Sequence, residues 1–128
     1  MYNSYWYISL NRPFLSPPDW IFLPIWIFLY ILIFISLITF LQTKSKNKKL
    51  GYIYFFIQLF LNFSWAPTFF ATKNIGGAFI IIVLLNIFIF LTIRYFLPIS
   101  KFASYNLIPY FLWTLFALYL NFGYLILN

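Results

Sequence analysis

The residues of this chain that could recognise a ligand are aromatic and amide side chains that recur at helical spacing. Four of them follow the pattern i, i+4, i+7 and i+11 and are Gln58, Asn62, Trp65 and Phe69. This spacing places all four on one face of an α-helix. A second stripe with similar spacing lies near the C-terminus and consists of Tyr110, Trp113, Ala117 and Asn121. A shorter pair, one helical turn apart, is Trp26 and Tyr30.

These stripes allow two interpretations. Indole, phenol and phenyl rings combined with amides suit the binding of a flat, hydrophobic ligand that carries a few polar groups. Alternatively, the rings fill core or lipid-facing positions and the amides hydrogen-bond neighbouring helices. Spacing alone leaves both interpretations open.

The composition excludes most other chemistry. Of the 128 residues, 65% are hydrophobic, 27% are aromatic and only 7% are charged, whereas about a quarter is usual in a soluble domain. The sequence has no His and no Cys, and Asp19 is its single acidic residue. Metal sites, Ser-His-Asp or Cys-His triads and paired carboxylates therefore cannot be assembled. We expect no catalytic residues, no metal site and a protein that is not an enzyme.

Long uncharged stretches must position the stripes. A bilayer core about 30 Å thick needs roughly 20 apolar helical residues, and strands of a membrane barrel are shorter and alternate in polarity. The predicted fold class is therefore all-α, a polytopic membrane helix bundle in one domain (1–128). The expected spans are about 19–41, 50–71, 75–95 and 102–127.

The loop charges predict an orientation. The loop Lys44–Lys49 carries four cations, and Arg94 and Lys101 fall on the same side. Only Arg12 and Lys73 fall on the other side. We therefore expect the Lys44–Lys49 loop to be cytoplasmic and both termini to lie on the opposite side. A basic patch can also bind nucleic acid, but here the aromatic residues lie in apolar runs away from the lysines, so we expect no nucleic-acid partner.

Three blocks of the sequence, in this order, resemble the TspO/MBR family, the translocator protein or peripheral-type benzodiazepine receptor family. The block similar to the family's first loop and second helix contains Trp6-Tyr7, Arg12-Pro13, Pro17-Pro18, Trp20, Pro24, Trp26 and Leu29-Tyr30. The block similar to its third helix contains Gln58-Leu59, Leu61-Asn62, Trp65 and Phe69-Phe70. The block similar to its fifth helix contains Pro109-Tyr110, Trp113, Phe116-Ala117, Leu120-Asn121 and Leu127-Asn128.

The resemblance implies a five-helix membrane protein, often a homodimer, with a cavity that takes porphyrins and, in some members, sterol-like or synthetic benzodiazepine-type compounds. The cavity positions that it implies here are Trp26, Asn62, Trp65, Trp113, Ala117 and Leu120, with Tyr30, Phe69 and Asn121 as additional wall residues. We therefore expect a receptor, sensor or carrier in contact with membrane lipid. Its expected ligand is a tetrapyrrole such as protoporphyrin IX or haem, and no cofactor is required.

The chain also departs from the family pattern. Met1 stands just before the loop that follows the family's first helix, so four of five spans are expected. Either the start lies upstream of Met1 or a partner chain fills the gap. Phe34 stands where the family often has glycine. Phe122 replaces an expected tyrosine and no basic residue follows Lys101, which weakens the case for sterol recognition.

Three alternative functions stay open from the sequence. Four spans in a short chain also fit a small multidrug-type transporter, for which Asp19 would be the only available carboxylate. Light-dependent porphyrin degradation would use Trp26 and Trp113. A truncated family member without binding activity would owe its aromatic content to biased genome composition.

Overall fold

The protein is a bundle of antiparallel helices in this computed structural model, which describes residues 21–45, 48–71 and 74–127. The chain order is α2 (Phe22–Gln42), α3 (Lys49–Ala66), the π-helix η2 (Pro67–Ala71), α4 (Ile75–Phe96), α5 (Lys101–Tyr105) and α6 (Ile108–Leu127). No strand occurs within these ranges. The predicted all-α fold class is therefore confirmed.

Two prolines explain where one helical segment ends or another begins. Pro67 has no backbone N–H and cannot continue the hydrogen-bond ladder of α3, and the chain widens there into η2. Pro109 lies in the first turn of α6, where a missing N–H leaves no bond unmade. The stretch expected to run continuously over 102–127 is accordingly divided into α5 and α6 by a turn at Asn106 and Leu107.

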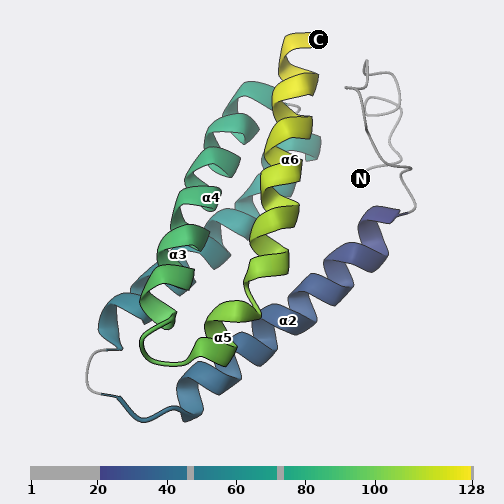
Figure 1. The fold of residues 1–128 in the computed structure, drawn as a ribbon. Coiled ribbons are helices and arrows are strands. Elements are labelled where there is room, and N and C mark those ends of the chain that lie inside the picture. The colour runs from purple at the N-terminus through teal and green to yellow at the C-terminus, as the bar shows by residue number, and fades with distance from the viewer. Residues whose placement is uncertain (1–20, 46–47, 72–73, 128) are drawn as a thin grey trace.

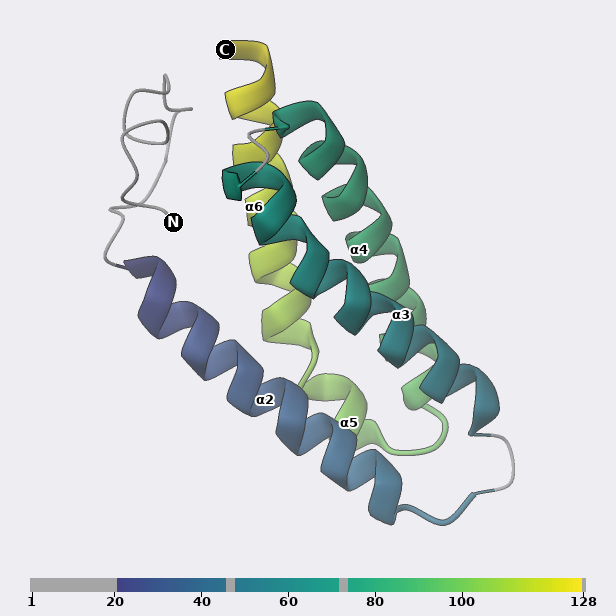
Figure 2. The ribbon, with the colours of Figure 1, turned by 180° about the vertical axis from the view of Figure 1, so that it is seen from behind.

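The helices α3, α4 and α6 form the centre of the bundle, with α4 packed against both α3 and α6. Helix α2 lies at an angle to them. It runs beside α5 and diverges from α6 toward its own N-terminal end, as the front and rear views both show (Figures 1 and 2). The main apolar core contains residues of α2, α3, α4, α5 and α6, among them Ile33, Phe55, Leu85, Ala103 and Tyr110.

The outer surface is apolar over most of its length. Within the described part of the chain, three helical stretches are long and apolar enough to cross a membrane: Leu23–Gln42, Ile75–Phe96 and Lys101–Leu127. Helix α3, also expected to be a span, is less apolar because its buried face carries Gln58 and Asn62. Residues 19 and 20 of the first expected span, including Asp19, lie outside the described residues.

Candidate ligand-binding site

A chain of side-chain hydrogen bonds joins α2, α3 and α6 in the interior. The Tyr30 hydroxyl donates to Asn62 Oδ1. Asn62 Nδ2 donates to the Tyr110 hydroxyl at 2.7 Å, and that hydroxyl donates to Gln58 Oε1, also at 2.7 Å. Gln58, Asn62 and Tyr110 are buried, so these bonds form in an apolar surrounding where an unmade hydrogen bond is costly.

Two further groups of hydrogen bonds fix α6 against its neighbours. Trp65 Nε1 donates to Asn121 Oδ1 at 2.9 Å, and Asn121 Nδ2 donates to the Ile75 carbonyl at 3.2 Å. Asn86 Nδ2 donates to the Ile82 carbonyl and to the Thr114 carbonyl, and the Thr114 hydroxyl lies 3.0 Å from Asn86 Oδ1. The first group links α3, α6 and α4, and the second links α4 and α6, so the amides act here as interhelical ties.

One hydrogen-bond donor of these buried amide side chains has no partner among the described residues. Gln58 is 1% exposed, and its Nε2 has no hydrogen-bond partner among the described residues. The remaining amide groups are bonded to protein atoms. A ligand that reached this region with a polar edge would meet the Gln58 donor directly and would have to exchange the other bonds.

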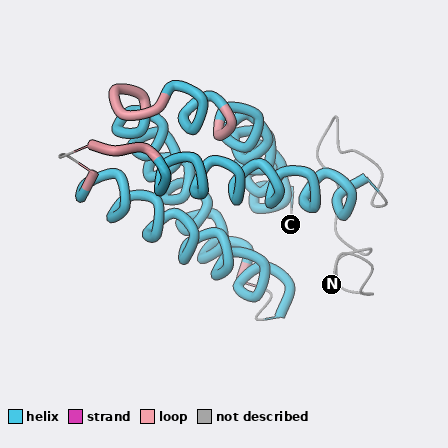
Figure 3. Tube along the Cα trace, turned by 90° about the horizontal axis from the view of Figure 1, so that it is seen from below, coloured by secondary structure: helices cyan, strands magenta, loops and turns pink. Residues whose placement is uncertain are grey.

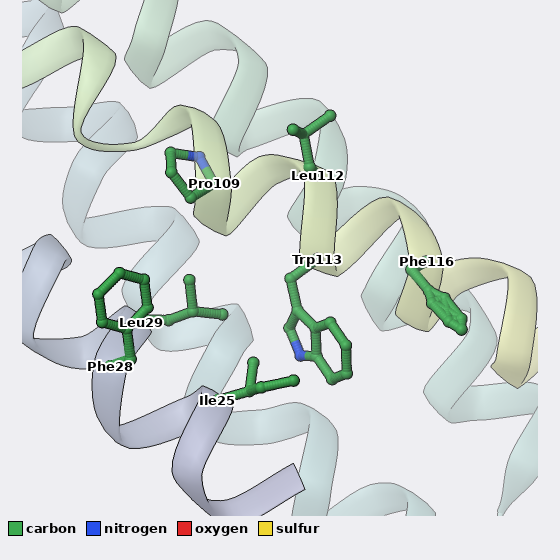
Figure 4. A pocket seen from close by; sticks show the side chains of 7 residues that line it. All are labelled: Ile25, Phe28, Leu29, Pro109, Leu112, Trp113 and Phe116. Carbon is green, nitrogen blue, oxygen red and sulfur yellow. The ribbon is translucent and has the colours of Figure 1, made fainter. Parts of the chain in front are cut away.

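An apolar groove lies between α2 and α6 (Figure 4). Its volume is about 490 Å³, and its walls are Ile25, Phe28, Leu29, Pro109, Leu112, Trp113 and Phe116. Figure 4 shows Trp113 extending from α6 toward Ile25 on α2. The Phe116 ring lies 5.6 Å from the indole, edge to face. The groove opens where α2 diverges from α6, because only the C-terminal half of α2 is held by α5.

The nine residues expected to line a cavity occupy two neighbouring clusters. Ala117 belongs to the main core, against which Trp26, Tyr30, Trp65 and Trp113 pack. Phe69 and Leu120 form a second cluster that also contacts Trp65. Asn62 and Asn121 join these clusters through their bonds to Tyr30 and Trp65. Trp113 is the one member of the nine that lines the groove.

Sequence reasoning left several residues of this region out of the expected site. Gln58 and Tyr110 lie on the two stripes, and their place there was the signal that could have included them. The aliphatic groove residues Ile25, Leu29 and Leu112 carried no such signal, because they are indistinguishable in sequence from lipid-facing neighbours.

Comparison with known proteins identifies the family. The model of the TspO/MBR family matches residues 1–127. The chain belongs to the TspO/MBR family. The tryptophan-rich protein TspO of Chlorobaculum tepidum is 42% identical over 127 residues, which are 98% of this chain and 80% of that protein. The tryptophan-rich sensory protein of Cereibacter sphaeroides is 30% identical, with 96% of this chain and 77% of that protein covered. The sheep (Ovis aries) translocator protein is 35% identical, with 91% and 71% covered.

Family membership and the three long apolar helices make this TspO/MBR chain an integral membrane protein. The relatives are named as sensory or translocator proteins, and none of these names denotes an enzyme. Phe34, which stands where glycine was expected from the family, is 63% exposed on α2. The large side chain is therefore accommodated by pointing it outward.

Proposed function

We propose that this TspO/MBR protein binds a tetrapyrrole such as protoporphyrin IX within the membrane, as a receptor, sensor or carrier. The observation that carries the proposal is the apolar groove between α2 and α6, which has the indole of Trp113 in its wall. Its volume falls in the range of about 300–1,000 Å³ typical of small-molecule sites.

The chemistry of the groove fits a flat apolar ring system. Trp113 and Phe116 on α6 offer aromatic faces and edges, and Ile25 and Leu29 on α2 form an aliphatic wall opposite. Aromatic rings pack well against extended π-systems in offset or edge-to-face arrangements. Because the groove opens to the outer surface of the bundle, a hydrophobic ligand dissolved in the bilayer reaches it without crossing the polar interior.

The buried polar chain then gives the site a second layer. The two clusters that contact the groove residues Trp113 and Phe116, with the amides bonded to them, are included as the inner wall of the proposed site: Trp26, Tyr30, Trp65, Phe69, Ala117, Leu120, Asn62 and Asn121. A polar edge of the ligand would exchange hydrogen bonds with Asn62 and Gln58. The proposal is binding without turnover, because the sequence has no His or Cys and one carboxylate.

Titration with protoporphyrin IX, followed by tryptophan fluorescence, tests the site. Phe28 lines the groove and Phe34 lies on the same helix at similar exposure, 56% against 63%, without lining it. We expect Phe28→Ala to weaken binding about tenfold, the effect of losing about 1.4 kcal/mol of apolar contact, and Phe34→Ala to leave it unchanged. Trp113→Phe should reduce quenching and affinity together.

Two outcomes would count against the proposal. Equal affinities for the two phenylalanine variants would remove the groove as the site. An absence of quenching by protoporphyrin IX in a helical, folded sample would remove the ligand class.

The orientation is part of the same proposal. The described cations lie at the end of the bundle formed by the α2–α3 loop, the end of α4 and the start of α5, and α6 ends at the opposite side (Figure 1). We infer that the Lys44–Lys49 side is cytoplasmic. Protease access to a tag placed within the α2–α3 loop, in sealed vesicles of known sidedness, tests this assignment.

A further inference from the structure

Every cation among the described residues lies at one end of the bundle. The five are Lys44, Lys48, Lys49, Arg94 and Lys101. They belong to the end of α2, the start of α3, the end of α4 and the start of α5, which lie together at the lower end of the bundle in Figure 1 and on the left in Figure 3. No acidic side chain occurs in the described ranges, so this cationic end has no counter-charge there.

One of the five cations is engaged within the protein. Lys48 Nζ donates to the Thr43 carbonyl at 2.5 Å and lies 4.9 Å from the Phe40 ring centroid and 5.7 Å from that of Tyr52. These carbonyl and cation–π contacts close the α2–α3 loop. Lys44, Lys49, Arg94 and Lys101 are exposed, and four positive charges therefore face outward.

The short helix α5 gives this end a fixed amphipathic rim. The Ser36 hydroxyl donates to the Ala103 carbonyl at 2.7 Å, and the Ser104 hydroxyl donates to the Ile93 carbonyl at 2.8 Å. These bonds tie the buried side of α5 to α2 and α4. Its outer side presents Lys101 beside Phe102 and Tyr105, which are 61% and 56% exposed. Aromatic and basic side chains combined in this way are typical of the membrane–water interface.

From this arrangement we propose that the cationic end binds the phosphate headgroups of anionic phospholipids. The outward charges provide the attraction, which is unopposed by any described acid. The surface next to them provides the second half of the match, because Leu41, Leu50 and Phe102 are exposed beside the cations. A phospholipid fills both parts, with its headgroup on the cations and its acyl chains along the apolar helices, whereas free phosphate uses the charges alone. The proposal is independent of the tetrapyrrole site.

Native mass spectrometry of the full chain tests the proposal. The detergent-solubilised protein is incubated with an equimolar mixture of phosphatidylglycerol and phosphatidylcholine that have identical acyl chains. We expect phosphatidylglycerol adducts to exceed phosphatidylcholine adducts at least about fivefold, the effect of one cation acting at full strength. The excess should fall clearly when four charges are removed in the variant Lys44→Gln, Lys49→Gln, Arg94→Gln and Lys101→Gln, which keeps Lys46 and Lys48.

A charge-conserving variant is the matched control. Changing the same positions by Lys→Arg and Arg94→Lys should retain the preference, and all variants keep Lys48, so the loop contacts stay intact. Circular dichroism checks that each variant is helical. Equal binding of the two lipids to the wild type, or an undiminished excess in the glutamine variant, would overturn the proposal. A larger loss of adducts in inorganic phosphate than in sodium chloride of equal ionic strength would assign the site to free phosphate instead of lipid.

Discussion

The cationic end of the bundle and the half that carries the groove between α2 and α6 (the groove half) both contain aromatic side chains, but these side chains are packed differently. At the cationic end, the Phe40 and Phe96 rings stack with centroids 3.9 Å apart and planes 6° from parallel, and Phe55 lies parallel to Phe96 at 5.9 Å. All three side chains are fully buried. In the groove half, Phe28 is 56% exposed and Trp113 is half-buried. Aromatic content therefore does not decide whether a region is closed or open.

The two regions differ in packing because different residues face their aromatic rings. Gly51 on α3 faces the Phe40–Phe96 stack, and a Cβ added there would come within 2.8 Å of Phe40 Cζ. The missing side chain lets the helices approach until the rings fill the space. In the groove half, α2 is tied by the Tyr30–Asn62 hydrogen bond while its neighbour α6 carries Pro109 and bulky residues on the facing side. The N-terminal half of α2 is therefore not packed closely against α6, and a groove lies between the two helices.

The largest expected loss of stability comes from disrupting the stacked rings at the cationic end. Phe96→Ala removes a fully buried ring that contacts both Phe40 and Phe55, and cavities of this kind cost about 3–5 kcal/mol. Unfolding of the detergent-solubilised protein, followed by circular dichroism, measures the loss. Phe90→Ala on the same helix is the control, because Phe90 is 54% exposed. Similar losses for the two variants would contradict the tight packing assigned to the cationic end.

Overpacking the same end should have the next largest effect. Gly51→Ala forces the Phe40 and Phe96 rings apart, which we expect to lower the free energy of unfolding by about 1–3 kcal/mol. Gly76→Ala is a matched control in α4, since its Cβ would meet its nearest atoms at 3.9 Å, an ordinary contact distance. If Gly51→Ala and Gly76→Ala change the free energy of unfolding equally, the missing side chain at Gly51 does not determine how closely the helices approach at the cationic end.

A smaller effect is expected from the polar tie in the groove half. Tyr30→Phe removes the hydroxyl that donates to Asn62, and interhelical hydrogen bonds in membrane proteins average about 0.6 kcal/mol. The same unfolding measurement should detect a modest loss for Tyr30→Phe. For Tyr105→Phe, an exposed position on α5, it should detect none. A loss of several kcal/mol would show that this single bond, and not apolar packing, holds α2 in place.

The smallest stability effect is expected in the groove wall itself. Leu112 is 60% exposed, and Leu112→Ala should change the free energy of unfolding by less than about 0.5 kcal/mol. A clear loss of stability would mean that Leu112 is packed against other groups and that the groove is closed in the bilayer. The groove half and the cationic end would then differ in their side-chain types and not in how tightly they are packed.

The helices and their buried faces could be predicted from the sequence because they depend on local pattern. The uncharged stretches produced α2, α4 and the α5–α6 stretch, and the period of the α3 stripe placed Gln58 and Asn62 on the buried side. The π-helix at Pro67 and the break before Pro109 were not expected. A proline leaves a backbone bond unmade, but whether the chain then widens, turns or kinks depends on the helices around it.

For the candidate site too, local features could be predicted from the sequence, and contacts between distant residues could not. The order of the three sequence blocks indicated the TspO/MBR family, to which the chain belongs, and the helical spacing predicted that the aromatic and amide stripes face inward. It could not determine which amides bond to which helices, because the Asn62–Tyr110 and Trp65–Asn121 contacts join residues 48 and 56 positions apart. The sequence predicted Trp113 as a cavity residue but did not indicate the aliphatic residues Ile25, Leu29 and Leu112 of the groove, which resemble lipid-facing side chains in sequence.

The amino-acid sequence by itself determined an all-helical membrane protein with few ionisable groups, because length, hydropathy and residue type act locally and survive any arrangement of the helices. The tertiary structure decided which end is closed by stacked rings, where α2 leaves a groove against α6, and that the described cations lie together at one end of the bundle. Those features depend on the distances and angles between helices, and these are set by contacts between residues far apart in the chain.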